Sequence, residues 1–153
     1  MILLNTKIKK AKQESEVLPG LVRQARRTLV EARSHFFPVD LFPDTIKVDE
    51  EKVTVITRTF LLSSEVHGVD LKDVTNVFIN TSPFFAQLVI VSKTFEENII
   101  QISSLWLKDA IYVRRIIEGM RVMLNKQVDT SVYSKIELLA KLEELTVTDE
   151  VVE

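Results

Sequence analysis

The stretch that decides the fold lies at residues 67–92 and reads HGVDLKDVTNVFINTSPFFAQLVIVS. It holds two runs rich in β-branched and aromatic residues, VTNVFINT at 74–81 and FFAQLVIVS at 84–92, and Ser82-Pro83 separates them. Such residues favour strands, and a Ser-Pro step breaks a strand and begins a turn. The stretch therefore predicts two strands. It carries no obvious chemistry, so we expect its role to be packing.

The strand pattern continues on both sides of this stretch. Residues 45–62 read TIKVDEEKVTVITRTFLL and predict a hairpin whose acidic turn, Asp49-Glu50-Glu51, we expect to be solvated. A weaker strand is expected at SEVHGV, residues 64–69, and a further one at NIIQISS, residues 98–104. The middle of the chain is thus predicted to be a succession of short strands.

At Ser104 the hydrophobic period changes from that of a strand to that of a helix. Apolar residues recur at steps of four and three, which is the spacing of one helix face. Ser103 or Ser104 is expected to cap the helix N-terminus, and Asp109 lies near the first turn, where the helix dipole favours an acid. The predicted stripe consists of Trp106, Ala110, Val113, Ile117, Met120 and Leu124.

This order of strands and helix resembles the bacterial pleckstrin-homology-like (PH-like) domains. The resemblance covers residues 43–126 and is carried by KVTVITRTFLL, VDLKDVTNVFI, FFAQLVIVS, NIIQISSL and the helix WLKDAIYVRRIIEGM. It implies an α+β fold, an antiparallel PH-like β-barrel capped by a C-terminal helix, with DLKD at 70–73 as a solvated turn at the rim. The residues that would line the barrel core are Val74, Val77, Ile79, Leu88 and Ile90.

The resemblance also implies a module that docks to proteins or to membrane surfaces. Phosphoinositide-binding members of the wider superfamily gather Lys and Arg around the first hairpin turn. Here that turn is acidic and would repel a phosphate, so phosphoinositide binding is not carried over to this chain.

Composition narrows the class of protein further. A chain of 153 residues suits one domain, and the absence of cysteine excludes disulfides and thiolate metal sites. The apolar runs are far shorter than the roughly 20 residues of a membrane-spanning helix. The chain begins with apolar residues before its lysines, the reverse of a secretory signal. We therefore expect a cytoplasmic protein, which can also lie peripherally at the inner face of the membrane.

Little in the sequence supports catalysis. His35 and His67 are far apart and accompany no serine–acid spacing, and the three glycines are isolated, so a glycine-rich phosphate loop cannot form. We expect no enzyme, no cofactor and no metal site. Residues 41–128 are nearly neutral, with ten basic and eleven acidic residues, and no groove-reading pattern is present, so nucleic acid is not expected as a partner.

The N-terminal segment 1–42 is predicted to be a basic helical extension with an apolar linker. LPGLVRQARRTLVEARSHFF at 18–37 places apolar residues along one helical stripe and arginines on the other sides. Such a helix can bind an anionic membrane or an acidic groove, or it can pack on the domain with its arginines solvated. The stripe consists of Leu18, Leu21, Val22, Ala25, Leu29, Ala32 and Phe36.

The linker FFPVDLFP at 36–43 is either a docking patch, a membrane wedge or a staple onto the core of the domain itself. The candidate contacts to a protein partner or to lipid are Arg23, Arg26, Arg27, Arg33, Phe36, Phe37 and Phe42.

The tail 127–153 is predicted to be an acidic helical segment. Residues 1–40 carry eight basic and four acidic residues, whereas residues 129–153 carry two basic and seven acidic ones. We expect the basic N-terminal helix to pack against the acidic tail, within one chain or between two, with burial of their stripes as the driving force. The tail stripe consists of Val132, Ile136, Leu139 and Leu142 or Leu145.

Three functions compete. The sequence favours an interaction module that docks to a protein partner or forms a homo-oligomer through its terminal helices. The alternative is a peripheral module that binds anionic lipid through the basic helix. An enzyme or small-ligand carrier that uses the barrel interior is least favoured, because the inward positions are mostly apolar.

Overall fold

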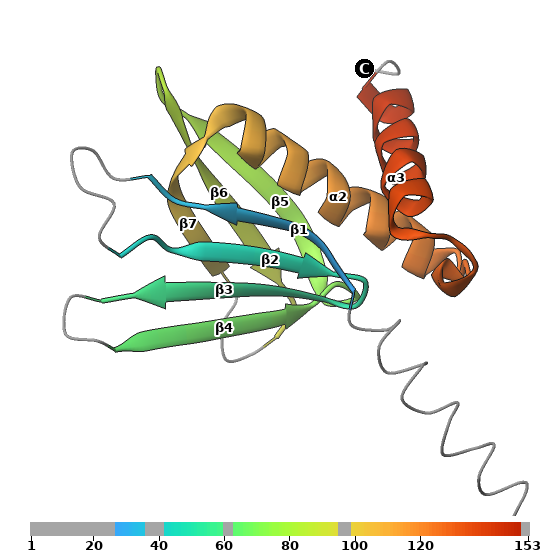
Figure 1. The fold of residues 1–153 in the computed structure, drawn as a ribbon, viewed down its shortest axis with the longest axis horizontal. Helices are drawn as coiled ribbons and strands as arrows, with labels where there is room; N and C mark the ends of the chain where they lie inside the picture. The colour runs from blue at the N-terminus through green and yellow to red at the C-terminus, as the bar shows by residue number, and fades with distance from the viewer. Residues whose placement is uncertain (1–26, 36–41, 60–62, 95–98, 151–153) are drawn as a thin grey trace, which may run out of the picture.

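The computed structural model describes residues 27–35, 42–59, 63–94 and 99–150. Seven strands form two antiparallel sheets, and helices follow them (Figure 1). The first sheet contains β1 (Thr28–Arg33), β2 (Thr45–Asp49), β3 (Lys52–Arg58) and β4 (Ser64–Asp70) in chain order. The second contains β5 (Val74–Thr81), β6 (Phe85–Ser92) and β7 (Ile99–Trp106). The long helix α2 (Leu107–Asn125), the short helix η1 (Thr130–Val132) and α3 (Lys135–Glu150) complete the chain.

The core lies between the inner faces of the two sheets and α2. Alternate residues of β3 and β6 are buried, as expected for sheets with one covered face. Val74, Val77, Leu88 and Ile90 are buried as predicted, and Ile79 packs at the edge of the core. The bounds of β2 to β7 agree with the predicted strands to within a few residues.

The two sheets meet at one corner. The N–H of His35, just after β1, donates to the carbonyl of Ser104 in β7 at 2.7 Å. Strand pairing among the described residues otherwise stays within each sheet. The seven strands and the helix therefore match the implied arrangement, whereas a closed barrel is not formed by strand pairing in the described ranges.

The sheet begins earlier than the predicted domain boundary at residue 43. Residues 28–33, which the sequence analysis assigns to a helix, form β1 and pair antiparallel with β2. The register shifts between Thr28 and Val30, so Leu29 is an extra residue in a β-bulge. The bulge lets Leu29 and Ala32 both reach the core, and this spacing of three residues resembles a helical stripe.

A second bulge shapes the end of β7. Its register against β6 shifts between Ala86 and Leu88, and Ser104 adopts a left-handed backbone with φ of 58°. A bulge re-aims the residues that follow it. Leu105 is fully buried, and the next residue, Trp106, points outward.

Valine in place of Ser104 is expected to lower the free energy of unfolding by about 1–2 kcal/mol, because a β-branched residue tolerates positive φ poorly. Glycine at the same position is expected to be neutral or stabilising, since glycine adopts this conformation without strain. Urea denaturation of the two variants tests the difference. Equal stabilities of Ser104→Val and Ser104→Gly would contradict the left-handed assignment.

The long helix starts later than predicted. Ser103 and Ser104 belong to β7, and α2 begins at Leu107 after Trp106, whose side chain makes no capping hydrogen bond. Asp109 lies in the first turn as predicted. Ala110, Val113, Ile117 and Met120 are buried as predicted, but Trp106 is 40% exposed and is not part of the buried stripe.

The tail helix packs on α2 within the same chain (Figure 1). Its buried residues are Leu138, Leu142 and Thr146, whereas Val132 and Ile136, which were predicted to lie on the stripe, are exposed. Gly119 permits the close approach, because a Cβ built there would lie 3.0 Å from Leu142 Cδ2 and 3.2 Å from the Leu142 carbonyl oxygen. The prediction of a helical tail is confirmed, and the predicted stripe is wrong in part.

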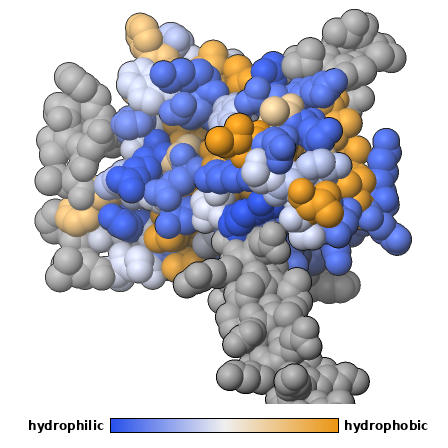
Figure 2. All heavy atoms as spheres, turned by 45° about the vertical axis from the view of Figure 1, so that its right-hand side comes forward, coloured by the Kyte–Doolittle hydropathy of each residue, from blue (hydrophilic) through white to orange (hydrophobic). Residues whose placement is uncertain are grey.

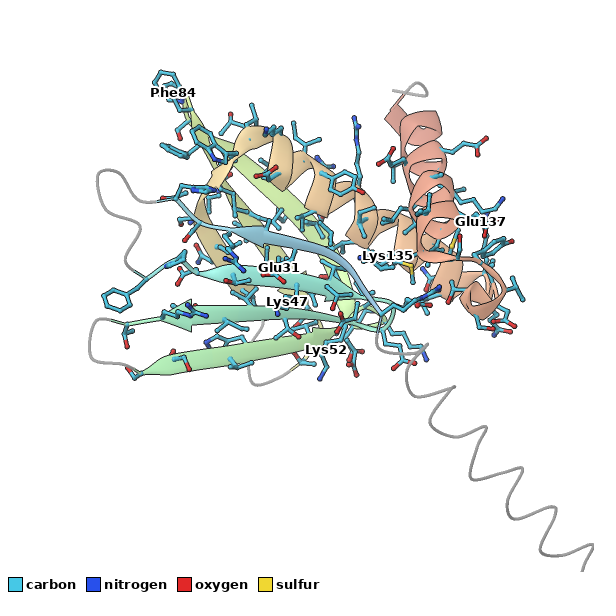
Figure 3. The ribbon with its side chains drawn as sticks, viewed as in Figure 1. Glu31, Lys47, Lys52, Phe84, Lys135 and Glu137 are labelled. Atoms are coloured by element: carbon cyan, nitrogen blue, oxygen red, sulfur yellow. The ribbon has the colours of Figure 1, made fainter. Side chains whose placement is uncertain are left out.

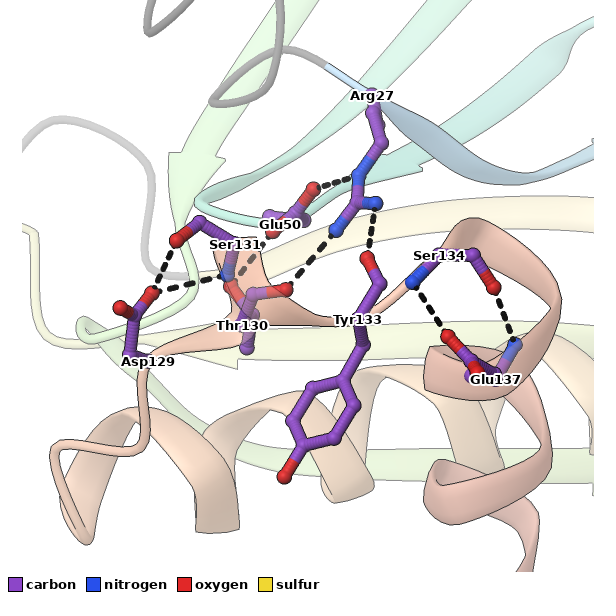
Figure 4. A network of polar contacts seen from close by, with 8 residues as sticks. All are labelled: Arg27, Glu50, Asp129, Thr130, Ser131, Tyr133, Ser134 and Glu137. Carbon is purple, nitrogen blue, oxygen red and sulfur yellow. Dashed lines mark hydrogen bonds and ion pairs between the residues drawn. The ribbon is translucent and has the colours of Figure 1, made fainter.

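A capping box begins α3. The N–H of Ser134 donates to the Glu137 carboxylate at 2.8 Å, and the N–H of Glu137 donates to Ser134 Oγ at 3.3 Å (Figure 4). The bond from the Ser134 backbone lowers the pKa of Glu137 below its ordinary value of 4.5, and the Ser134 hydroxyl and the charge of Lys141 act in the same direction. The box thus favours the ionised form of Glu137.

This lowered pKa predicts that the first turn of α3 loosens in acid. A carboxylate whose pKa is depressed on folding stabilises the fold above the unfolded value of 4.5, and this contribution is lost as the pH falls through the folded pKa. We expect amide protection factors of Glu137 and Leu138, whose N–H groups both donate to Ser134, to fall below pH 4.5, and we expect Glu137→Gln to remove this pH dependence. A Glu137 carboxyl titration midpoint at or above 4.5, measured by NMR, would contradict the assignment.

Within the described residues, the helices are all too short or too polar to cross a bilayer.

Candidate interaction surface

Aromatic side chains gather where the β5–β6 hairpin, β7 and the end of β1 come together. The Trp106 ring lies 5.0 Å from the ring of Phe85 and 5.4 Å from the ring of His35, as measured between ring centroids, and both pairs are tilted. These separations are typical of favourable aromatic contacts. We call His35, Phe84, Phe85, Trp106 and Leu107 the aromatic surface.

The hairpin turn explains why Phe84 projects outward. The N–H and the hydroxyl of Ser82 each donate to the carbonyl of Phe85 at 2.8 Å, which closes the turn with Pro83 and Phe84 at its centre. Phe84 is 74% exposed, and it stands at the tip of the hairpin in Figure 3. A large apolar side chain held at a turn by local hydrogen bonds is available to another molecule.

Strand pairing holds Trp106 beside the same hairpin. Trp106 pairs with Phe85 across β6 and β7, so their side chains share one face of the sheet. Trp106 is held by Phe85 and His35, yet 40% of its surface is exposed. A rigid, partly exposed tryptophan is the residue type most enriched at the energetic centre of protein interfaces.

A groove adjoins the aromatic surface. It has a volume of about 410 Å³ and lies between β5 and the first half of α2. Leu107 belongs to both the groove and the aromatic surface, so the two are continuous. On the polar side, Arg114 Nε donates to Glu118 Oε1 at 3.1 Å. The lining residues are Ile79, Thr81, Leu107, Ile111, Arg114, Arg115 and Glu118.

The described part of the chain holds no group of three or more His, Cys, Asp or Glu side chains that could bind a metal ion. Figure 2 shows one face of the molecule, on which hydrophilic residues make up most of the surface and hydrophobic ones lie between them in separate areas.

Arg27, a predicted contact residue, lies in an internal network that we call the polar clasp, formed by Arg27, Glu50, Thr130 and Tyr133. Arg27 donates to the Glu50 carboxylate, to the Tyr133 carbonyl at 2.7 Å and to the Thr130 carbonyl at 3.2 Å (Figure 4). The Thr130 hydroxyl donates to Glu50 at 2.6 Å. Glu50 is only 5% exposed, so the expectation of a fully solvated acidic turn is wrong for this residue.

The DLKD turn differs from expectation in the same way. Leu71, within it, is buried, and its N–H donates to the Glu51 carbonyl at 2.8 Å. The two neighbouring turns therefore help to hold the first sheet, and only some of their side chains reach solvent.

The other predicted contacts are spread over the surface or lie outside the described residues. Arg33 is exposed and donates to Glu31, and this hydrogen bond lowers the pKa of Glu31, with Lys47 acting in the same direction. Phe42 is 40% exposed. Arg23, Arg26, Phe36 and Phe37 lie outside the described residues.

Pairs of adjacent large apolar residues in the sequence carry a signal for the aromatic surface. Side chains alternate between the two faces of a strand, so the adjacent Phe84 and Phe85 cannot both enter the core. The run Leu105-Trp106-Leu107 gives the same signal. Consecutive large apolar residues at the end of a strand cannot all face the core, so some of them lie outside it. Such pairs mark where apolar side chains reach solvent.

Comparison with known proteins adds little to this description. No family model matches the chain, and no curated protein matches it. Among solved structures, the chain is similar to the pleckstrin homology (PH) domain of USP37, with a TM-score of 0.42 and 13% sequence identity over 60% of this chain and 96% of that domain. A likeness at this level assigns neither a partner nor an activity.

Proposed function

We propose that this chain is a non-catalytic PH-like interaction module that docks to a protein partner through the aromatic surface and the β5–α2 groove. The observation that carries the proposal is the exposure of Trp106 and Phe84 on rigid elements, with Trp106 braced by Phe85 and His35. Contiguous exposed apolar groups mark binding sites on monomeric proteins, and tryptophan contributes strongly to binding energy.

The residues that line the groove suit a partner segment that carries both apolar and acidic side chains. Ile79, Leu107 and Ile111 offer apolar surface, and Arg114 and Arg115 offer positive charge on the side of α2. A partner carboxylate would compete with Glu118 for Arg114. Steering by these charges would raise the association rate more than the affinity.

Photo-crosslinking tests this proposal. A photoreactive phenylalanine analogue replaces Phe84 in one chain and Ile136 in another, because Ile136 is 82% exposed on α3 and serves as a matched control. We expect Phe84 to capture a defined protein that Ile136 does not capture. The purified partner should then bind Trp106→Ala at least about tenfold more weakly, which corresponds to roughly 1.4 kcal/mol. Equal capture at both sites, or unchanged affinity of Trp106→Ala, would contradict the proposal.

A membrane-surface role is the second candidate, because Trp and Phe side chains at a protein surface also suit the interface of a bilayer. Cosedimentation with anionic and neutral vesicles, at low and physiological salt, separates the two. Salt-sensitive pelleting with anionic vesicles, lost when Arg23 and Arg26 become Glu while Arg27 is kept in the polar clasp, would favour the basic segment as a lipid contact. Pelleting that is lost when Trp106 and Phe84 are replaced would indicate that the aromatic surface binds lipid. If the aromatic surface binds a protein instead, we expect neither of these two pelleting results.

A further inference from the structure

A second groove lies between the C-terminal half of α2 and α3. It has a volume of about 410 Å³, and its walls are mainly apolar. Tyr133 forms part of the wall, and the Lys141 ammonium lies 5.2 Å from the centroid of its ring. Val128, another wall residue, is 37% exposed. The remaining lining residues are Val122, Met123, Lys126, Glu144 and Leu145.

We infer that this groove is the docking site for the N-terminal segment of the same chain, residues 17–26. The segment reads VLPGLVRQAR, and its apolar residues Leu18, Leu21, Val22 and Ala25 recur at helical spacing. A groove with apolar walls on an otherwise polar helix pair gains free energy when such a stripe covers it.

The contacts of Arg27, the first described residue, support the N-terminal segment as the occupant of the groove. Arg27 is fixed by its guanidinium to the carbonyl of Tyr133, and the ring of that same tyrosine lines the groove. The described chain therefore begins at a residue whose side chain reaches the loop that forms one end of the groove. A helix rises about 1.5 Å per residue, so a stripe from residue 18 to residue 25 would span roughly 10 Å next to Arg27 and could cover the groove without unfolding the first sheet.

Charge also favours the same-chain occupant. Residues 1–26 carry six basic and two acidic residues, whereas residues 129–153 carry two basic and seven acidic ones. On α3, Glu143 and Glu144 are exposed. The carboxylate of Glu143 lies close enough to the Tyr112 hydroxyl to add to the effect of burial in raising the tyrosine pKa. Basic side chains of the N-terminal segment would meet Glu143 and Glu144 on the α3 side of the groove, whereas Lys126 and Lys141 also line it. Charge would therefore set the orientation of the segment more than its affinity.

Disulfide trapping in the full chain tests the inference, because the sequence contains no native cysteine. Val22→Cys is combined with Val128→Cys at the groove, and in a control chain with Ile99→Cys, an exposed position on β7. We expect the groove pair to form an intramolecular disulfide at least about tenfold faster than the control pair, since docking raises the effective concentration of the two thiols. Leu18→Asp with Leu21→Asp should return the groove pair to the control rate.

Each other result overturns the inference. Equal rates for the two pairs would show that the segment does not dock in the groove. Disulfide-linked dimers that disappear on dilution would assign the groove to the segment of a second copy. Fast trapping that survives Leu18→Asp with Leu21→Asp would show that the apolar stripe does not hold the segment. Circular dichroism melting of each chain confirms that the comparison is made between folded proteins.

Discussion

Replacing Arg27 by methionine is expected to lower the free energy of unfolding by about 3 kcal/mol, because Glu50 would be left buried without its ion-pair partner. The side chains of Arg27 and Glu50 are 18% and 7% exposed, so water cannot take over the role of the guanidinium. The loss should be largely reversed in the double variant Arg27→Met with Glu50→Met, in which no charge remains buried. Urea denaturation of the parent, Arg27→Met, Glu50→Met and the double variant measures the coupling between the two residues.

Arg33→Met is the matched control for this prediction. Arg33 also bonds a glutamate, Glu31, but these side chains are 64% and 33% exposed. An ion pair at the surface contributes between about 0 and 1 kcal/mol, so the variant should lie close to the parent. If Arg27→Met were as stable as Arg33→Met, the polar clasp would have no role in holding the tail to the first sheet.

Leucine in place of Gly119 is expected to detach α3 from α2. The Leu142 carbonyl oxygen lies 3.2 Å from the position of an added Cβ, and this atom belongs to a helix backbone that cannot rotate away. Detachment would expose Leu138 and Leu142, both fully buried, and burial of a leucine side chain contributes about 1.5–3 kcal/mol. Hydrogen exchange should show loss of protection in residues 135–146 while β2 to β7 keep theirs.

Gly68→Leu provides the comparison, since it makes the same chemical change in a strand. A Cβ at Gly68 would meet only the flexible side chain of Lys52, with its nearest atom at 3.6 Å. We expect this variant to keep full protection of α3 and to change the stability little. Normal protection of α3 in Gly119→Leu would mean that the helices adjust their separation at low cost.

The strands β3, β6 and β7 could be predicted because their buried residues alternate along short runs bounded by turns. Residues 74–81 coincide with β5, in which only Val74 and Val77 are buried, so there the β-branched composition was the useful signal. The polar clasp could not be predicted, because its members are separated by up to 106 residues and nothing local distinguishes Arg27 from its neighbouring arginines.

The errors have specific physical causes. A bulge at Leu29 gave β1 the apolar spacing of a helix, and an unrecognised bulge at Ser104 moved the start of α2. In α3, the leucines at 138, 139, 142 and 145 cover more than one face, so the sequence could not select the buried one. Packing against α2 selects the buried face, since Gly119 of α2 leaves room for Leu142.

The polar clasp also fixes an order of events during synthesis. Strands in both sheets pair with their neighbours in the chain, so hairpins can form as soon as each strand leaves the ribosome. Arg27 and Glu50 are only 23 residues apart and can meet early. Their other partners follow Arg27 by 103 and 106 residues. The ion pair at the amino end of the sheet therefore stays partly open to water until residues 130 to 133 have been made.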